Sequence, residues 1–269
     1  MPIVVAGKLV VDEILQLAMP VLPGGRQRAL NSTITGGGQV WHTSRVIRAA
    51  GVECAVTGWA GGDADSAMLR QQLAEAGVTD HLVVAGQASR STVLVGPDGD
   101  RSIISRGGPA TLSPSQLIDT RVLDGAAWLH IDGYGFDDGV GEAFVTLARA
   151  AAEHGVPVSL EPPSPQHRDR VAGFLAALPP LEAVLGNPDE VAMVEQMLAT
   201  PPRYVVIHDG PNEAICRGPS GEVRQRPAMT PAVTNGAGDR FAGGWIAAAV
   251  RGASPPERLT EALGSAARA

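Results

Sequence analysis

The chain has 269 residues, a length common for α/β proteins with one large domain or a domain plus a small lobe, and its 44% hydrophobic and 18% charged residues are ordinary for a soluble globular protein. Its formal net charge of −7 argues against nucleic acid or an anionic membrane as the main partner. A ligand that carries phosphate would therefore need local positive potential from backbone amides, arginines or a metal ion.

Phosphate-binding loops that depend on lysine are excluded, because the chain has 20 arginines and a single lysine. Lys8 is followed by Leu9, so there is no Gly-Lys-Ser/Thr loop, and the Val-Ala-Ile-Lys strand of protein kinases is absent. Cys54 and Cys216 have neither metal-site nor redox spacing, which favours two buried structural thiols. The N-terminus does not resemble a signal peptide and no window is long enough to span a membrane, so we expect a cytoplasmic protein.

Apolar runs of strand length alternate with glycine-terminated helices in the first 107 residues. The Gly-Pro-Asp-Gly-Asp run at 96–100 predicts a hairpin turn. Segments near 10–35 and 89–107 do not fit a strict strand–helix alternation, so we expect them to form a small β lid. The predicted strands are 3–6, 10–17, 28–35, 53–58, 81–85, 91–95 and 101–105, and the predicted helices are 36–50 and 64–76.

The alternation becomes regular in the second half of the chain, where a hairpin follows the last parallel strand and two helices close the sequence. Alternating strands and helices predict a mostly parallel sheet covered on both faces, a three-layer α/β/α fold in a single domain. The predicted strands are 127–131, 156–160, 183–185 and 204–207, the hairpin is 214–217 with 222–225, and the helices before the final pair are 141–154, 166–177 and 188–199.

The most informative segment is 234–244, Thr-Asn-Gly-Ala-Gly-Asp-Arg-Phe-Ala-Gly-Gly, a glycine-rich turn that runs into an apolar helix. Amides at the start of a helix lack internal partners and lie at the positive end of the helix dipole, which favours an anion. Asp239 would repel such an anion, so its presence suggests a carboxylate that takes a proton from an attacking hydroxyl. The simpler alternative is a tight loop in which Asp239 only caps the helix.

Three segments, in the right order, resemble the signatures of the ribokinase-like, PfkB-type carbohydrate kinases. Glycines 36–38 with residues 56–63 resemble the N-terminal signature, residues 185–190 resemble the Asn-x-x-Glu motif, and residues 235–244 resemble the C-terminal signature. The likeness extends over about residues 3–267. It implies a ribokinase-like fold and an ATP- and Mg²⁺-dependent kinase that phosphorylates a hydroxyl of a sugar, sugar acid or nucleoside.

The resemblance also implies residue roles at the phosphate end of the site. Asp239 matches the catalytic base, and the amides of Gly236, Ala237 and Gly238 match the anion hole. Two further residues, Asn187 and Glu190, match positions that act near Mg²⁺, often through water, and Glu190 would be the residue that holds the metal in this way. The alternative for Asn187 is that it caps a helix starting at Pro188, and both roles are compatible.

At the substrate end, Asp12 and the glycines Gly37 and Gly38 match the sugar-binding positions of the family. A carboxylate can accept hydrogen bonds from two adjacent hydroxyls, and glycines let a substrate lie against the backbone. Arg106 could hold an acidic or phosphorylated substrate, or it could be an exposed edge-strand arginine that prevents aggregation. Gly210 matches a nucleotide-loop position, with a plain turn glycine as the alternative.

Three departures from the family pattern motivate a second hypothesis, a catalytically weak sugar- or nucleoside-binding protein on the same scaffold. Trp41 stands where the family often has Asn, and we expect it at the mouth of the sugar site, where it stacks on a ligand or fills the pocket. Val233 replaces a common Asp, and the chain ends 30 residues after Asp239. A dinucleotide-dependent oxidoreductase is a poor third reading, because no Gly-x-Gly-x-x-Gly follows the first strand. Apolar Val21 and Leu22 suggest a lid-mediated homodimer, as in relatives.

Overall fold

A nine-stranded sheet forms the centre of the protein in the computed structural model, which describes residues 1–107, 113–136, 139–229 and 235–268. Its strands are β1 (Ile3–Lys8), β4 (Cys54–Ala60), β5 (Thr79–Val84), β8 (Trp128–Asp132), β9 (Val158–Glu161), β10 (Ala183–Gly186), β11 (Tyr204–His208), β12 (Ala214–Gly218) and β13 (Gly221–Gln225). They lie in the order β13-β12-β11-β10-β9-β8-β1-β4-β5. The strands from β11 to β5 run parallel, and β12 and β13 add an antiparallel hairpin at one edge.

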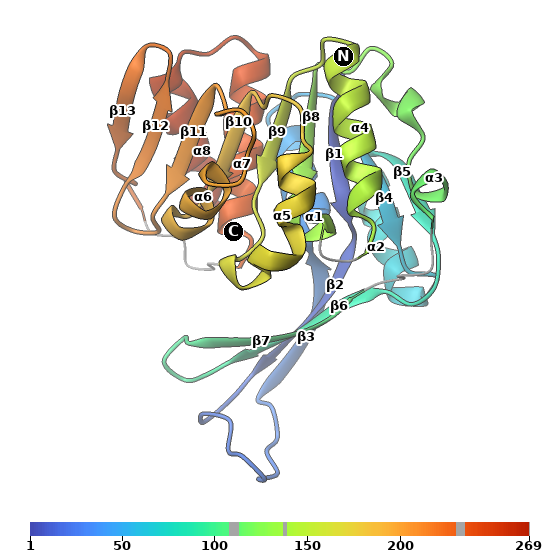
Figure 1. The fold of residues 1–269 in the computed structure, drawn as a ribbon. Coiled ribbons are helices and arrows are strands. Elements are labelled where there is room, and N and C mark those ends of the chain that lie inside the picture. The colour runs from blue at the N-terminus through green and yellow to red at the C-terminus, as the bar shows by residue number, and fades with distance from the viewer. Residues whose placement is uncertain (108–112, 137–138, 230–234, 269) are drawn as a thin grey trace.

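Helices cover both faces of this sheet, as the regular alternation predicts (Figure 1). One face carries α1 (Gly38–Ala49), α2 (Ala64–Glu75), α7 (Ala237–Val250) and α8 (Pro255–Ala267), and the other carries α4 (Gly141–Glu153), α5 (Arg168–Ala176) and α6 (Pro188–Glu195). Successive strand side chains point to opposite faces, so Ile3 and Val5 enter one core cluster and Val4 and Ala6 the other. The predicted three-layer α/β/α fold is confirmed.

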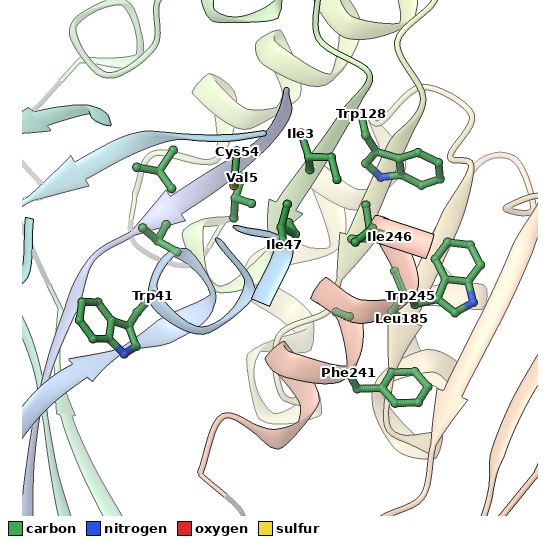
Figure 2. Close-up of a cluster of buried hydrophobic side chains, with 14 of the residues drawn as sticks. Ile3, Val5, Trp41, Ile47, Cys54, Trp128, Leu185, Phe241, Trp245 and Ile246 are labelled. Carbon is green, nitrogen blue, oxygen red and sulfur yellow. The ribbon is translucent and has the colours of Figure 1, made fainter. Parts of the chain in front are cut away.

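The core between the sheet and the helix pair α7–α8 is built from aromatic and aliphatic side chains of distant segments (Figure 2). Trp128 of β8 meets Trp245 of α7 edge to face, with ring centroids 6.1 Å apart. Phe241, one turn before Trp245, is fully buried, and so is nearly every residue that follows it in α7. Cys54 and Cys216 are buried and unbridged, as expected from their spacing.

A second sheet of four strands forms the small β lobe, in the order β3-β2-β6-β7. Its strands are β2 (Val10–Gln16), β3 (Asn31–Gly37), β6 (Ser89–Val95) and β7 (Arg101–Arg106). Each hairpin is antiparallel, whereas β2 and β6 pair in parallel and so join the two segments that the sequence marked as irregular. The small sheet projects away from one end of the main sheet (Figure 1).

Local sequence signals predicted the bounds of most helices and strands to within a few residues. The helix predicted over 166–177 begins instead with a 3₁₀ turn, η3 (Pro165–His167), and the one predicted over 188–199 ends at Glu195. Short helical turns that the sequence reading did not include are α3 (Pro114–Leu117), η1 (Thr120–Leu123) and η2 (Gly133–Phe136). Within the described ranges, no helix has the length and apolar character needed to cross a bilayer.

Candidate active site

A cavity of about 750 Å³ lies where the carboxyl ends of the parallel strands face the small sheet. The chain builds the main sheet outward from β1 in both directions, through β4 and β5 on one side and β8 to β11 on the other. The strand ends diverge at such a reversal and leave a crevice, which is where open α/β sheets bind ligands. The strand ends contribute Lys8, Asp132, Glu161 and His208, and the start of α7 contributes Gly238 and Asp239.

The start of α7 has the geometry of an anion site. Gly236 precedes the helix with a φ of +68°, a left-handed conformation that favours glycine, and no side chain caps the first amides. A Cβ at Gly236 would lie 2.4 Å from the His42 ring, so packing as well as backbone conformation requires glycine here. Thr43 Oγ1 donates to the Asp239 carbonyl at 3.0 Å and ties this first turn to α1.

Asp239 is mostly buried, and its carboxyl group is hydrogen-bonded to that of Glu161, the last residue of β9. Burial is the largest cause that raises the pKa of both carboxyl groups well above their ordinary values, and mutual repulsion adds to it for Asp239. Arg240 opposes the shift of Asp239, while Glu190 and Asp132 add to that of Glu161. Two such groups in contact hold a proton at a pH where an exposed carboxyl has lost it.

These raised pKa values make the stability of the unliganded protein pH-dependent. A carboxyl whose pKa is raised by folding contributes stability below its unfolded pKa, and that stability is lost as the pH rises through the folded pKa. We expect Asp239→Asn to be more stable than the wild type at pH 8 by about 1–3 kcal/mol, the range for an uncompensated buried polar or charged group. The difference should shrink at pH 4.

Urea unfolding of both proteins at the two pH values checks this. Desolvation lowers the pKa of His42, His130 and His208 to about 4 in each case, and this affects both proteins alike and cancels in the comparison. A stability difference that does not change between pH 4 and pH 8 would show that the two carboxyl groups do not share a proton.

Asp12 reaches the cavity from β2 and connects the small sheet to the start of α7. Its side chain is 6% exposed and accepts a hydrogen bond from Asn235 Nδ2 at 3.0 Å. Burial raises its pKa, and the bond from Asn235 opposes this. A Cβ at Gly37 would lie 2.3 Å from the Asp12 carboxylate, so glycine at 37 is what leaves room for Asp12. The next residue, Gly38, lines the cavity itself.

Asn187 and Glu190 form a reciprocal cap at the start of α6. Asn187 Oδ1 accepts from the Glu190 amide, and Glu190 Oε2 accepts from the Asn187 amide, both at 2.9 Å. The capping alternative is therefore observed for Asn187. Both residues nevertheless line the cavity, where burial raises the pKa of Glu190. Among the described residues, no group of three or more His, Cys, Asp or Glu side chains is arranged to hold a metal ion without other ligands.

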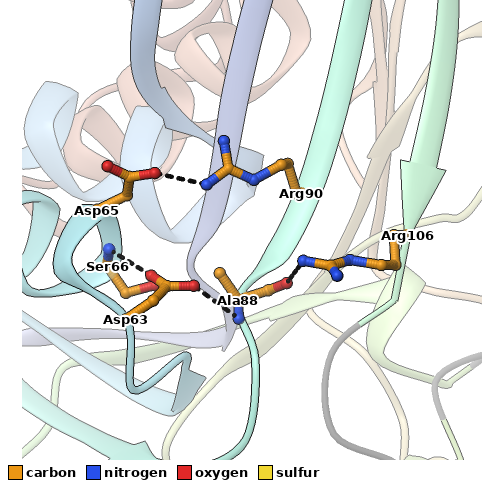
Figure 3. Close-up of polar contacts among 6 residues, drawn as sticks. All are labelled: Asp63, Asp65, Ser66, Ala88, Arg90 and Arg106. Atoms are coloured by element: carbon orange, nitrogen blue, oxygen red, sulfur yellow. Dashed lines mark hydrogen bonds and ion pairs between the residues drawn. The ribbon is translucent and has the colours of Figure 1, made fainter.

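Arg106 also lines the cavity, at the end of β7 where the small sheet meets the main body. Its guanidinium donates to Gln87 Oε1 at 2.6 Å and to the Ala88 carbonyl at 3.4 Å, and both acceptors are uncharged. Figure 3 shows the Ala88 contact beside Asp63, which accepts from the Ala88 amide at 3.2 Å. The neighbouring cation of the cavity wall, Arg90, is instead paired with Asp65 (Figure 3).

Trp41 and Gly210 are not among the residues that line this cavity. The Trp41 side chain is 4% exposed and lies in the hydrophobic core, where a Cβ at Gly36 would be 2.1 Å from its ring. Arg45 covers the ring at 4.5 Å from its centroid. The expectation that Trp41 sits at the mouth of the site is thus corrected, because glycine at 36 leaves space that the indole fills. Val233 lies outside the described residues.

Sequence reasoning did not single out several cavity residues. Asp132 and Glu161 are register partners at the ends of β8 and β9, so parallel pairing places them side by side at the carboxyl ends of these strands. The available signal was a carboxylate directly after a buried strand, in Leu-His-Ile-Asp and Ser-Leu-Glu. Lys8, Gln39 and His208 were also missed as lining residues.

Solved structures of other proteins share this fold. A probable sugar kinase from Rhizobium etli CFN 42 has a TM-score of 0.84 and 20% identity, covering 99% of this chain and 92% of that chain. Adenosine kinase from Schistosoma mansoni in complex with 2-fluoroadenosine has a TM-score of 0.81 and 20% identity, covering 98% and 94%. Ribokinase from Cryptococcus neoformans var. grubii serotype A in complex with ADP has a TM-score of 0.79 and 18% identity, covering 99% and 92%.

Likeness at these identities shows a shared ribokinase-like fold. A search of curated proteins by sequence found no match. The sequence model of the pfkB family of carbohydrate kinases matches residues 9–269, nearly the whole chain.

Proposed function

Because the chain belongs to the pfkB family of carbohydrate kinases, we propose that it transfers the γ-phosphoryl group of ATP to a hydroxyl of a sugar, sugar acid or nucleoside. The observation that carries this proposal is the position of Asp239. Its carboxyl group stands at the uncapped start of α7, in a cavity that it shares with Asp12 of the small sheet. One end of the cavity thus suits hydroxyl groups and the other suits phosphate.

Asp12 and Gly38 form the acceptor end of the proposed site. Asp12 Oδ2 already accepts from Asn235, which orients the carboxylate and leaves Oδ1 to accept from a substrate hydroxyl. Gly38 lets the substrate lie close to the start of α1. Arg106, whose acceptors Gln87 and Ala88 are uncharged, provides a positive charge for the acidic group of a sugar acid or phosphorylated sugar.

Asp239 is the proposed general base. It takes the proton of the acceptor hydroxyl as that oxygen bonds to the γ-phosphorus, while the bond from phosphorus to the β-phosphate oxygen breaks and its electron pair leaves with ADP. The amides of Gly236, Ala237 and Gly238 stabilise the charge on the transferring group. Removal of one such donor typically costs about 3 kcal/mol of transition-state stabilisation.

Asn187 and Glu190 suit a Mg²⁺ that arrives with the nucleotide. The capping hydrogen bond occupies Glu190 Oε2 and leaves Oε1 to accept from a metal-bound water. Mg²⁺ keeps several waters and takes few protein ligands. When bound, the ion would neutralise phosphate charge. Asn187 and Glu190 would hold its waters, and the small sheet would keep bulk water out of the cavity.

A coupled assay of ADP formation across sugars, sugar acids and nucleosides, with Mg²⁺ and ATP, tests the proposal. We expect at least one acceptor to stimulate ADP formation well above the rate with water alone. Calorimetry that detects sugar or nucleoside binding without any affinity for Mg²⁺–ATP would contradict it and favour a binding protein.

Replacement of Asp12 tests the acceptor end separately. We expect Asp12→Asn to raise the KM for the acceptor about tenfold, because an amide replaces a carboxylate that accepts hydrogen bonds from hydroxyls, whereas the KM for ATP should change little. Asp98→Asn, an exposed carboxylate on the far turn of the small sheet, is the matched control. An equal rise in both KM values would place Asp12 outside the acceptor subsite.

The exposed apolar side chains of β7 and of the loop between β2 and β3 support the proposed homodimer. Ile104 is 66% exposed, and Val21 and Leu22 are 50% and 52% exposed. Apolar groups gathered on one lobe are typical of a contact surface. Sedimentation velocity should show a dimer that Ile104→Glu dissociates, whereas Met229→Glu, at an equally exposed position outside the small sheet, leaves it intact. A wild-type monomer at high concentration would refute the homodimer.

A further inference from the structure

The cavity wall that the small sheet provides changes from polar to apolar with distance from the main sheet. Asp12, Ser91 and Ser105 are register partners on β2, β6 and β7, so their side chains share one face of the small sheet. Ser91 Oγ and Ser105 Oγ are hydrogen-bonded at 3.0 Å. The next pair on this face is Val93 and Ile103, about 6–7 Å further along the strands. All of these residues line the cavity.

Ile103 leaves part of this apolar surface uncovered. It is 55% exposed, whereas Val93 beside it is buried. The neighbouring Ile104 belongs to the opposite face and is not among the residues that line the cavity. Contact with an apolar part of a ligand would remove the Ile103 side chain from water, which is favourable. The outer part of this wall therefore suits an apolar group.

The main body contributes an aromatic side chain, Tyr134, to the same cavity. Tyr134 lies in the η2 turn between Gly133 and Gly135, which both pack closely against the main body. A Cβ at Gly133 would be 2.6 Å from the Glu161 carbonyl oxygen, and a Cβ at Gly135 would be 2.1 Å from the Phe144 ring. This packing fixes the backbone of the turn, and the Tyr134 side chain remains 37% exposed. Tyr134 thus presents an aromatic surface from a rigid position.

His167 of η3 supports the Tyr134 ring and also lines the cavity. The two rings meet edge to face, with centroids 5.6 Å apart and an angle of 77° between their planes. Both ring nitrogens of His167 have partners on its own segment, because Nδ1 lies 2.9 Å from an Arg170 nitrogen and Nε2 lies 3.1 Å from Gln166 Nε2. The ring is therefore held in place beside Tyr134.

These two walls suit an acceptor that has hydroxyl groups at one end and a flat apolar ring at the other. A nucleoside has this composition, since its base has two apolar faces and an edge of donors and acceptors. A free sugar or sugar acid carries hydroxyls along its whole length and would leave Ile103 and Tyr134 uncovered. We propose that the acceptor is a nucleoside, whose sugar binds at Asp12 and whose base packs between Ile103 and Tyr134.

This assignment rests on the proposed function and narrows its three acceptor classes to one. The hydroxyl groups of Ser91 and Ser105 stand between Asp12 and the apolar pair on the small sheet. Each hydroxyl can donate and accept, so the two serines can meet the polar edge of a base.

Acceptor kinetics with adenosine, guanosine, cytidine, uridine and D-ribose, at saturating Mg²⁺ and ATP, tests the proposal. We expect at least one nucleoside to have a kcat/KM at least 100-fold higher than that of D-ribose. Ile103→Ser and Tyr134→Ala should each lower the kcat/KM for that nucleoside about tenfold and change that for D-ribose less than twofold. Tyr134→Phe keeps the ring and should match the wild type. Ile34→Ser, at an exposed isoleucine on the face of the small sheet opposite Asp12, is the control.

Two results would overturn the proposal. One is a free sugar or sugar acid with a higher kcat/KM than every nucleoside. The other is a kcat/KM for the nucleoside that Ile103→Ser and Tyr134→Ala leave unchanged, or lower no more than they lower that for D-ribose.

Calorimetry with each nucleoside in the absence of ATP separates this proposal from the proposed function. Nucleoside binding that is weakened in Ile103→Ser and Tyr134→Ala, without any ADP formation, would support the nucleoside site and contradict the kinase activity. ADP formation that sugars stimulate, with no binding of any nucleoside, would support the kinase activity and overturn the nucleoside site.

Discussion

Asp239→Asn is expected to lower turnover about a thousandfold while the fold and the affinity for the acceptor are retained. General-base catalysis contributes about 10²–10⁴-fold, and the amide that replaces the carboxylate cannot take the acceptor's proton. The amide can still hydrogen-bond with Glu161, which preserves the packing at the start of α7. Steady-state kinetics of ADP formation measures the effect.

Retention of the parental rate by Asp239→Asn would refute the base assignment. Asp169→Asn, an exposed carboxylate in the first turn of α5, should behave like the wild type in the same assay. Circular dichroism and the pH-dependent gain in stability described above establish that the Asp239 variant is folded. A large loss of turnover with unchanged acceptor KM would place the effect in the chemical step.

Gly236→Ala should have the second largest effect, with turnover lowered about a hundredfold. The methyl group would meet the His42 ring, at a Cβ distance of 2.4 Å, and the residue would have to keep a φ of +68°. Movement away from the His42 ring, or a change of φ, would shift the first amides of α7 from the positions at which they stabilise the transferring phosphoryl group. Misplacement of one such donor alone costs about 10²–10³ in rate.

Gly252→Ala is the matched control for this substitution. It has a φ of +80° beyond the other end of α7, but no atom lies within 4 Å of its Cβ position. Both variants therefore bear the cost of alanine in a left-handed conformation, about 1–2 kcal/mol of stability. Only Gly236→Ala should also have a lower turnover. If the two variants showed the same turnover, the amides at the start of α7 would not be part of the catalytic site.

Much of the fold could be predicted because its signals are local. Apolar runs of strand length, glycines after helices and the Asn-Pro-Asp-Glu cap at 187–190 act within a few residues of one another. The small sheet was harder, since its two hairpins are joined by the parallel pairing of Val10 with Ser89 and of the residues that follow. Contacts between such distant segments leave no periodic mark in the sequence.

The candidate site also has residues that local motifs predict and residues that only long-range contacts bring together. Asp12, Glu190 and Asp239 could be predicted because each stands beside a motif, and the structure brings all three to one cavity. Trp41 also stands beside such a motif, but its side chain packs against Gly36 and lies in the hydrophobic core. Glu161 had no motif of its own. Its importance arises only from its contact with Asp239, which is 78 positions later in the chain by numbering.

The sequence by itself determined the layered α/β architecture, the kinase family and the glycine-lined start of α7, because backbone conformation and hydrophobic periodicity depend on neighbouring residues. Tertiary structure alone decided which carboxyl groups share the cavity and which of them have a raised pKa. The pairing of β8 with β9 places Asp132 beside Glu161, the packing of α7 brings Asp239 to the same cavity, and burial raises the pKa of Glu161 and Asp239. All three depend on where the chain returns in space, and residue types at fixed spacing do not encode that directly.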